Sequence, residues 1–573
     1  MTADFDGVLD ELGHFGRYQL INYLLLFFPL FLSSAVSLTY AFAAGEPDYR
    51  CLVPECENRS DPYSPSWLSH ALPFTDGKPS ECKRYAVNHE ADFTNGSCPA
   101  SGFYTNVTQE CHDYVFRGEV VTIVNTFNLT CVENKWKLTL IGTMSFVGQF
   151  IGLPLAGMLA DRFGRRPVMV FSLLGFSICG LIKSFSPNYP TYICMEFLEA
   201  LTGGGVFQTL FVLALELVGP TRRTLGGVYI NVVYSIANGF LALVAWALPN
   251  WRHMLLALYA PGLTFVAYFW LVPESVRWLM SRDRYEEAAS IVKKVAKCNR
   301  VVLSESAMSI FRNPMEMSDC ESSQPVLPEE VPKAFDIKMV KEMMSSKILM
   351  IRLIVNFICW MSVTMVYFGL SLGSVTLSGN MYVNFAVTAL VETPGNGLSW
   401  PMMERLGRRW SLVLTFVFSG VLCLATPFLP DDGGASWLPI TAFLLGKIFI
   451  TASFNILYTY SSEMFPTGLR GSSLAACSTF GRIGSMLAPQ APLLAVYGPS
   501  LPYIVFGLMA LIAGFSSLVL PETLNQNLPD TVKEAEQLGR RIRKKKVKKT
   551  DELSRLETTR PKLVYEAIED GKK

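Results

Sequence analysis

The 573-residue sequence is poor in charged residues and carries almost no net charge. Asp, Glu, Lys and Arg make up only 17% of it, whereas about a quarter is usual for soluble domains. The 49 basic and 48 acidic residues leave a net charge of +1, which excludes a general electrostatic attraction for nucleic acid. Half of the residues are hydrophobic. These properties indicate a membrane protein.

The sequence also lacks the motifs of catalysis and of nucleotide hydrolysis. It contains only five histidines, and we find no metal-binding, nucleophile–base or phosphate-binding motif. Gly203-Gly-Gly205 lies inside an apolar run with no strand before it, so we interpret it as a place of close helix packing. Gly148-x-x-x-Gly152 has the same interpretation. We therefore expect no enzyme, no metal site and no cofactor.

Long hydrophobic runs occupy most of the chain. A helix needs about 20 mostly apolar residues to cross the hydrocarbon core of a membrane. Three segments fail this test, 44–135, 274–346 and 521–573. The remainder divides into twelve runs, which are 20–43, 136–160, 167–187, 190–218, 224–248, 251–273, 347–371, 377–403, 410–429, 436–463, 470–495 and 499–520. The prediction is an all-α membrane protein with 12 transmembrane helices.

Segment 44–135 holds every N-glycosylation sequon that we find and six of the 13 cysteines. The sequons begin at Asn58, Asn95, Asn106 and Asn128, and the cysteines are Cys51, Cys56, Cys82, Cys98, Cys111 and Cys131. Four sequons in one loop place that loop outside the cell or in the secretory lumen. An even set of cysteines in an oxidising compartment predicts three disulfides, whose pairing stays open.

Basic residues give the orientation of the chain. Arg162, Arg165 and Arg166 follow the second run, and Arg408 and Arg409 follow the eighth, so these ends and both termini are expected in the cytosol. The expected segments are a cytosolic N-terminus (1–19), the first span (20–43), an extracellular loop (44–135), spans two to six (136–273), a cytosolic linker (274–346), spans seven to twelve (347–520) and a basic cytosolic tail (521–573).

Three charged motifs occur twice at nearly constant offsets. Asp161-Arg-Phe-Gly-Arg-Arg166 matches Glu404-Arg-Leu-Gly-Arg-Arg409, the stretch from Glu216 to Arg222 matches that from Glu463 to Arg470, and Pro273-Glu-Ser275 matches Pro521-Glu-Thr523, at offsets of 243, 247 and 248 residues. Each copy follows the corresponding span of its half, so the chain is predicted to contain two six-helix halves. Two halves with a site between them are the arrangement that alternating access requires.

The repeated charges are candidates for a latch at the cytosolic ends of the helices. Such ion pairs would close that side when the site faces out and separate when the site faces in. The candidate residues are Asp161, Arg165, Arg166, Glu216, Arg222, Glu274, Glu404, Arg408, Glu463, Arg470 and Glu522. The alternative is that they are solvated anchors that obey the positive-inside rule.

The repeated motifs resemble those of the major facilitator superfamily over nearly the whole chain. Pro273-Glu-Ser-Val-Arg-Trp-Leu279, Gly446-Lys447, Ser461-Ser-Glu-Met-Phe-Pro-Thr467 and the large cysteine-bearing loop resemble its organic-ion branch. That branch holds organic cation, carnitine-type zwitterion and organic anion transporters. The resemblance implies the major facilitator fold and a secondary transporter of the plasma membrane.

Ionisable residues inside the predicted spans are candidates for a substrate cavity, because a charge in hydrocarbon is costly. Glu392, Lys447 and Arg482 lie within apolar runs, whereas Glu196 and Glu199 lie near the outer end of theirs, where solvation is expected. Arg482 is twelve residues into its run, which is about 18 Å along a helix. It either pairs with Glu392 or binds an anionic group of the substrate.

The resemblance implies further roles at matching positions. Arg482 stands where cation transporters of the branch carry Asp and where carnitine-type and anion transporters carry Arg; the segment 478–489 looks closest to the carnitine type. Asn396 stands where anion members commonly have Lys. Trp360, Tyr367, Phe454 and Tyr458 match aromatic residues of the cavity, and Asn455 matches a Gln or Glu of several cation members.

Together these observations predict a transporter of small organic zwitterions, such as carnitine-, amino-acid- or amine-conjugate-like solutes. Arg482 offers a planar pair of donors to a carboxylate. Glu392 and the aromatic faces would hold the amine end. An organic anion exchanger is the alternative within the class, and a transporter-like receptor or scaffold that binds a partner through its outer loop is the alternative outside it.

Other partners follow from the loops. No ATP-binding domain is found, so gradients or exchange would drive transport, with sodium or proton coupling left open. Eight basic residues between 540 and 549 either bind anionic membrane lipid or form a solvated, disordered trafficking tail. The cysteine-bearing loop offers a surface for a homo-oligomer, and no nucleic acid is expected.

Overall fold

The computed structural model describes residues 7–9, 11–13, 16–57, 62–75, 77–88, 93, 98–216, 223–311, 337–430, 437–526 and 528–538. The helices of the N-terminal half are α2 (Arg17–Ala35), α3 (Tyr40–Ala43), α6 (Lys135–Phe163), α7 (Arg165–Ser184), α8 (Tyr189–Glu216), α9 (Arg223–Ala247), and α10 (Trp251–Tyr259) followed by η5 (Ala260–Ala267) and α11 (Tyr268–Leu271). Those of the C-terminal half are α17 (Lys347–Gly373), η6 (Ser374–Thr376), α18 (Met381–Leu390), α19 (Glu392–Leu406), α20 (Arg408–Ala425), η7 (Thr426–Phe428), α21 (Trp437–Met464), α22 (Arg470–Leu487), η8 (Ala488–Gln490), α23 (Ala491–Tyr497), α24 (Leu501–Ser516) and η9 (Ser517–Val519).

Ten helical segments of the described chain are long and apolar enough to cross a membrane. Two of the twelve predicted spans, 377–403 and 470–495, are absent from this set because each is broken and polar. Pro394 has no N–H to donate to Leu390, so the helix breaks between α18 and α19. The segment 470–495 contains Arg482, and its helix α22 ends where the 3-10 helix η8 begins. Both segments still run within the bundle, α19 against α21 and α22 against α17.

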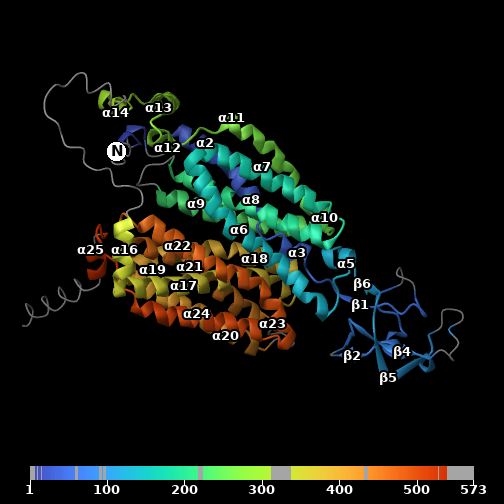
Figure 1. The fold of residues 1–573 in the computed structure, drawn as a ribbon. Coiled ribbons are helices and arrows are strands. Elements are labelled where there is room, and N and C mark those ends of the chain that lie inside the picture. The colour runs from blue at the N-terminus through green and yellow to red at the C-terminus, as the bar shows by residue number, and fades with distance from the viewer. Residues whose placement is uncertain are drawn as a thin grey trace, which may run out of the picture.

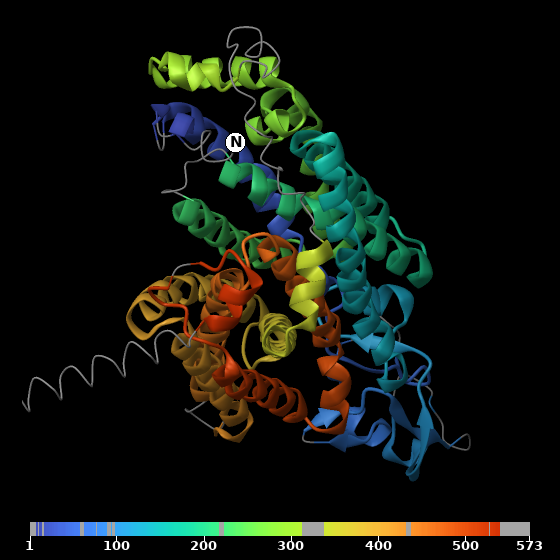
Figure 2. The ribbon, with the colours of Figure 1, turned by 60° about the vertical axis from the view of Figure 1, so that its left-hand side comes forward.

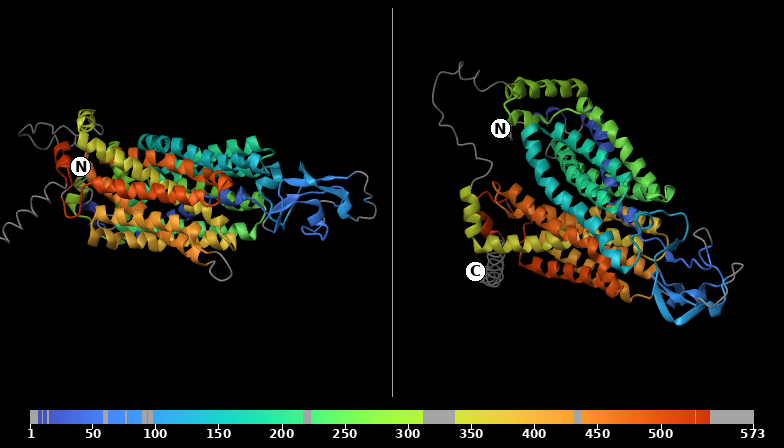
Figure 3. Two further views of the ribbon diagram at one scale, coloured as in Figure 1. Left: turned by 90° about the horizontal axis from the view of Figure 1, so that it is seen from below. Right: turned by 45° about the vertical axis from the view of Figure 1, so that its right-hand side comes forward.

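The two halves lie side by side as elongated bundles, one blue to green and the other yellow to red (Figure 1). A small domain extends from one end of the pair, which we call the outer end. At the opposite end, which we call the inner end, lie the linker helices α12 (Val276–Ser281) and α13 (Tyr285–Asn299) and the short helices α16 (Ile337–Ser345) and α25 (Val532–Gln537) (Figure 1). The halves lie closest near the outer end and diverge toward the inner end (Figures 1 and 3).

Segment 44–135 forms the outer domain, which consists of short strands and helical turns. Its three antiparallel pairs are β1 (Tyr49–Cys51) with β6 (Tyr114–Phe116), β2 (Phe74–Thr75) with β3 (Lys78–Pro79), and β4 (Lys83–Val87) with β5 (Phe103–Glu110). Its helical turns are α4 (Leu68–Ala71), η2 (Ala100–Gly102), α5 (Ile123–Phe127) and η3 (Val132–Asn134). Figure 2 shows these strands projecting beyond the ends of the long helices.

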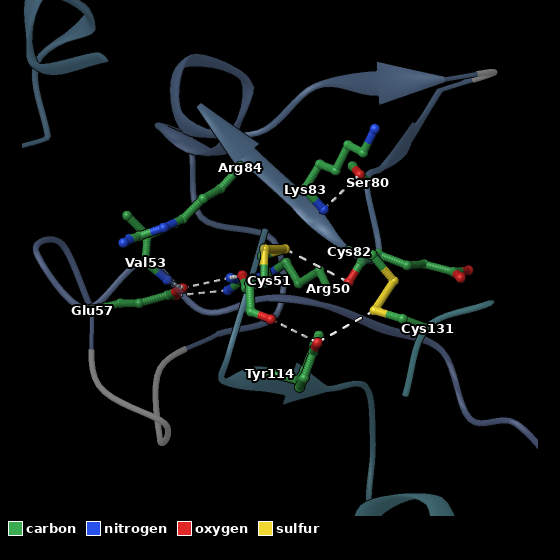
Figure 4. The surroundings of a disulfide bond; sticks show 12 residues. Arg50, Cys51, Val53, Glu57, Ser80, Cys82, Lys83, Arg84, Tyr114 and Cys131 are labelled. Carbon is green, nitrogen blue, oxygen red and sulfur yellow. Dashed lines mark hydrogen bonds and ion pairs between the residues drawn. A yellow bond between two sulfur atoms is a disulfide. The ribbon is translucent and has the colours of Figure 1, made fainter. Parts of the chain in front are cut away.

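The six cysteines of the outer domain form three disulfides, as predicted. The bonds are Cys51–Cys111, Cys56–Cys98 and Cys82–Cys131. Beside them the buried guanidinium of Arg50 donates to both carboxylate oxygens of Glu57, at 2.5 and 2.7 Å (Figure 4). Disulfides and this ion pair supply the cross-links that so small an apolar core needs.

Two of the four predicted glycosylation residues can be placed. Asn106 lies exposed on β5, and Asn128 is exposed just after α5 with a φ of 53°. Asn58 and Asn95 lie outside the described residues. The placed side chains are accessible to glycosylation, which stays a prediction.

The inner end carries the linker and the described parts of both termini. The linker helices are α12 (Val276–Ser281), α13 (Tyr285–Asn299), α14 (Glu305–Ser309) and α16 (Ile337–Ser345), and α25 (Val532–Gln537) follows the last span. Val8, Leu9 and Leu12 pack in one apolar cluster with Trp278 and Val292. The two ends of the described chain therefore lie on one side of the bundle, whereas the basic tail from 539 onward lies outside the described residues.

Candidate functional site

A cavity of about 230 Å³ lies between the two halves. Its walls come from α2, α6, α7, α8 and α9 on one side and from α17, α19, α21 and α22 on the other. A pocket that both halves complete is the place where a substrate can contact two bodies that move relative to each other. This cavity is the candidate site.

The cavity is closed toward the outer end by contacts between α6 and η8. The Thr139 hydroxyl donates to Gln490 Oε1 at 3.1 Å, and Gln490 Nε2 donates to the Thr143 hydroxyl at 2.6 Å. Deeper in, the rings of Phe146 and Phe368 pack with their centroids 4.8 Å apart. At the opposite end the two halves diverge (Figure 3).

Arg482 lines this cavity from α22. Its guanidinium donates to Oε1 of Gln149, on the opposite half, at 3.3 Å. Among the described residues we find no carboxylate that forms an ion pair with it. The guanidinium is therefore available to an anionic group that enters the cavity.

Glu392 pairs with a different cation. Lys447 Nζ lies 2.9 Å from Glu392 Oε1 and also donates to the Ser371 hydroxyl at 2.6 Å and to the Tyr367 carbonyl at 3.1 Å. This arrangement resolves the open question of a pair between Glu392 and Arg482, since the Glu392 charge is neutralised within the C-terminal half. Glu392 lines the cavity, whereas Lys447 lies behind it and is fully buried.

The four predicted aromatic residues form one cluster on the cavity wall. Trp360 packs edge-on against Tyr458 at 4.6 Å between centroids and donates its indole N–H to Ser461. Phe454 lies 5.4 Å from both Tyr367 and Tyr458. The Tyr367 ring is already in contact with a cation, because Lys447 Nζ lies 3.4 Å from its centroid.

Two amides complete this side of the cavity. Asn455 on α21 donates its side-chain N–H to the Asn396 oxygen on α19. Both residues line the cavity. The pair joins the broken span to its neighbour and leaves one amide acceptor and one donor group near the substrate space.

Glu196 and Glu199 are not solvated, in contrast to the expectation from sequence. Their exposed fractions are 3% and 6%, and both carboxylates contact the fully buried ammonium of Lys183. The sequence reasoning placed Glu196 and Glu199 near the outer end of their span and missed Lys183. A signal was present in the opposite charges near the facing ends of the two consecutive runs.

The charged motifs at the inner end of the N-terminal half connect helices of that half. Arg165 contacts Asp161 at 3.1 Å and Glu216 at 3.9 Å. The Glu274 carboxylate accepts the backbone N–H groups of Arg165 and Arg166, which are the first residues of α7. A carboxylate at a helix N-terminus stabilises the unpaired N–H groups there.

The same arrangement recurs in the C-terminal half. Arg408 contacts Glu463 at 3.2 Å, and Glu522 accepts the backbone N–H groups of Arg408 and Arg409 at the start of α20. A side-chain carbon at Gly407, whose φ is +85°, would stand in the space that the Glu522 carboxylate occupies. The positive φ and the lack of space for a side-chain carbon together explain why the repeated motif has a glycine at this position.

Two latch candidates have no ion pair among the described residues. Glu404 is exposed, and Arg470 contacts only the Thr467 hydroxyl in the described structure. Arg222 lies outside the described residues. Each of the described ion pairs joins parts of the same half. That the pairs separate when the site faces in stays a prediction.

The glycine motifs pack helices closely, as predicted. A side-chain carbon at Gly152 of α6 would overlap the Leu201 carbonyl of α8, and one at Gly148 would approach the Phe197 carbonyl to 2.6 Å. Gly203 and Gly205 likewise face side chains of neighbouring helices. These contacts hold the N-terminal wall of the cavity.

Known proteins resemble the chain over nearly its whole length. The family described as "Sugar (and other) transporter" matches residues 84–533. An "Organic cation transporter protein" of Drosophila melanogaster is 32% identical over 543 residues, which are 94% of this chain and 95% of that protein. The "Organic cation/carnitine transporter 2" of Homo sapiens is 32% identical over 550 residues, 92% of this chain and 93% of that protein.

Among solved structures, that of the major facilitator proton:xylose symporter XylE bound to 6-bromo-6-deoxy-D-glucose is 18% identical. The superposition covers 71% of this chain and 91% of the symporter chain with a TM-score of 0.52, so the two proteins share a fold. The predicted architecture of two helical halves is thus confirmed, and the chain is a multi-pass membrane transporter and not an enzyme. It belongs to the sugar (and other) transporter family of the major facilitator superfamily, in the branch of the organic cation and carnitine transporters.

Proposed function

We propose that this protein carries small organic zwitterions across the plasma membrane by alternating access, with both termini in the cytosol. The observation that carries the proposal is the guanidinium of Arg482, which lines the cavity and has no ion pair among the described residues. A fixed positive charge repels a simple organic cation and attracts a carboxylate. The relative named as an organic cation/carnitine transporter supports this choice.

In the proposed cycle the substrate carboxylate binds Arg482 while the outer end is open. The aromatic cluster of Trp360, Phe454 and Tyr458 then contacts the body of the substrate. Closure of the α6–η8 contacts and divergence of the inner ends produce the arrangement seen here. A substrate shifts the balance between the two states only through its different contacts with each.

The repeated charged motifs support a mechanical role in this cycle. Since the described pairs connect helices within one half, we infer that they keep the inner end of each half rigid while the halves move against each other. Glycosylation of the outer domain, lipid binding by the basic tail and self-association through the outer domain stay predictions.

Arg482→Ala tests the proposal. We expect uptake of labelled carnitine to fall at least tenfold, because the carboxylate loses its bidentate partner, and Arg482→Lys to recover part of it through charge alone. The measurement compares uptake of labelled zwitterions, anions and cations in cells, normalised to the protein at the surface. Uptake of anions only by the unaltered protein would contradict the proposal and favour an organic anion exchanger.

A further inference from the structure

The N-terminal wall of the cavity contains a buried cluster whose charges do not cancel. Lys183 Nζ lies 2.9 Å from Glu196 Oε2 and also contacts Glu199 Oε2. The hydroxyl of Tyr259 donates to Glu199 Oε1. One ammonium therefore faces two carboxylates, and with both ionised the cluster carries one negative charge.

The two carboxylates differ in how many of their oxygens have hydrogen-bond partners. Both oxygens of Glu199 have partners, whereas Oε1 of Glu196 has no hydrogen-bond partner among the described residues. Glu196 is 3% exposed and lines the cavity. A carboxylate oxygen that borders the cavity and has no donor from the described residues can accept a cationic group of a ligand.

Neighbouring hydroxyl groups point to the same conclusion. The Ser34 hydroxyl lines the cavity, is buried and has no hydrogen-bond partner in the part of the chain that the structure describes. The Tyr40 hydroxyl is also buried without a partner and lies within electrostatic range of Glu196. Both residues belong to the first span, which packs beside α9. A hydroxyl without a partner thus lines the same cavity as this oxygen, and a second one lies on the same span.

The C-terminal wall has the opposite balance. Lys447 neutralises Glu392, so Arg482 contributes one unbalanced positive charge to the same cavity. The two excess charges stand on opposite halves. A solute with an anionic and a cationic end matches this separation, whereas a solute with one charge leaves the other wall unpaired.

We propose that Glu196, held by Lys183 beside Glu199, is the subsite for the ammonium end of the substrate. This inference rests on the proposed zwitterion transport and assigns to the N-terminal half the role that the sequence had suggested for Glu392. A substrate held by Arg482 and Glu196 connects the two halves, and its binding is thereby sensitive to their relative position.

The test uses three probes that differ in charge. Carnitine carries both charges, its carbon isostere with a tert-butyl group in place of trimethylammonium keeps only the carboxylate, and choline keeps only the cation. Glu196→Gln is expected to raise KM for carnitine at least tenfold and to leave inhibition of uptake by the isostere unchanged or stronger. Cys194→Ser, at an exposed position of the same helix, is the matched control and is expected to leave both the KM for carnitine and the inhibition by the isostere unchanged.

The outcomes separate this inference from the proposed function. If the unaltered protein carries the isostere but not carnitine, zwitterion transport itself is refuted. Two results with a protein that does carry carnitine would refute only the Glu196 subsite. In the first, Glu196→Gln leaves the KM for carnitine unchanged. In the second, it weakens the binding of carnitine and of the isostere by the same factor. Should Glu196→Gln fail to reach the surface, Glu196→Asp is used, with a selective rise in KM for carnitine expected and an equal change for both probes contradicting the inference.

Discussion

At the scale of single residues, each buried ionisable group of the cavity is distinguished by its partners. Glu392 has Lys447, Glu199 has Lys183 and Tyr259, and within the described part of the chain Arg482 has the neutral Gln149 and no carboxylate. Groups with buried partners of opposite charge chiefly maintain the structure, because removing one partner leaves an uncompensated charge. Groups with a free side facing the cavity are the ones that a substrate can use.

The pair of Glu392 and Lys447 can be tested by a double-mutant cycle. Lys447→Met is expected to lower the stability of the protein by about 3–5 kcal/mol, because it leaves Glu392 buried without a counter-ion. Lys447→Met combined with Glu392→Gln should recover much of that loss. Thermal unfolding of the purified protein in detergent measures all four forms. Additive losses in the double variant would show that the two residues are not coupled.

Sequence predicted the residues of the site better than their partners. Arg482 was identified by its depth within a run, and the aromatic residues by resemblance, and the structure places them on one cavity. The pairs of Lys447 with Glu392 and of Lys183 with Glu196 join different helices. Which cation meets which carboxylate depends on helix rotation and packing, and these do not follow from a residue's position in an apolar run.

At the scale of helices, the walls of the cavity are set by close packing on one side and by broken helices on the other. α6 and α8 approach through Gly148 and Gly152, whereas α18 and α19 are separated at Val391. The two spans that are not long apolar helices are those that bring Glu392, Asn396 and Arg482 to the cavity. Polar function and weak hydropathy thus coincide in the same segments.

Gly152→Ala tests the packing of α6 against α8. The added methyl group would overlap the Leu201 carbonyl, so we expect a loss of about 1–3 kcal/mol in stability and reduced uptake. Gly157→Ala is the control on the same helix, since its nearest neighbour would be Gln208 at 3.9 Å and little change is expected. Thermal unfolding and uptake are measured for both. Equal effects of the two substitutions would contradict the assignment.

At the scale of the whole molecule, the repeated motifs predicted two equivalent halves, and the structure shows the same carboxylate caps in both. Glu274 and Glu522 each accept the first N–H groups of a helix, although 248 residues separate them. The direction in which the cavity faces was not predictable. That direction depends on the relative free energies of two conformations, and one sequence encodes both of them.

The outer closure predicts that a cross-link will stop transport. Thr139→Cys and Gln490→Cys replace side chains that touch across the two halves. Joining them with a short, reducible thiol reagent should abolish uptake, because the outer end can no longer open, and reduction should restore it. Each single substitution and the unaltered protein, treated in the same way, are the controls. Full uptake by the cross-linked protein would show that this contact need not open.

The attachment of the outer domain has a practical consequence. Val121 bonds to the backbone on both sides of Asn250, and Trp251 donates its indole N–H to Thr126, so the domain is fastened to the loop before α10. That loop belongs to the N-terminal half, which the domain must follow when the halves rotate. An antibody fragment bound to the disulfide-bonded surface would therefore move with the N-terminal half. Its tilt relative to the C-terminal half, measured by electron microscopy, would distinguish the conformations of the transport cycle.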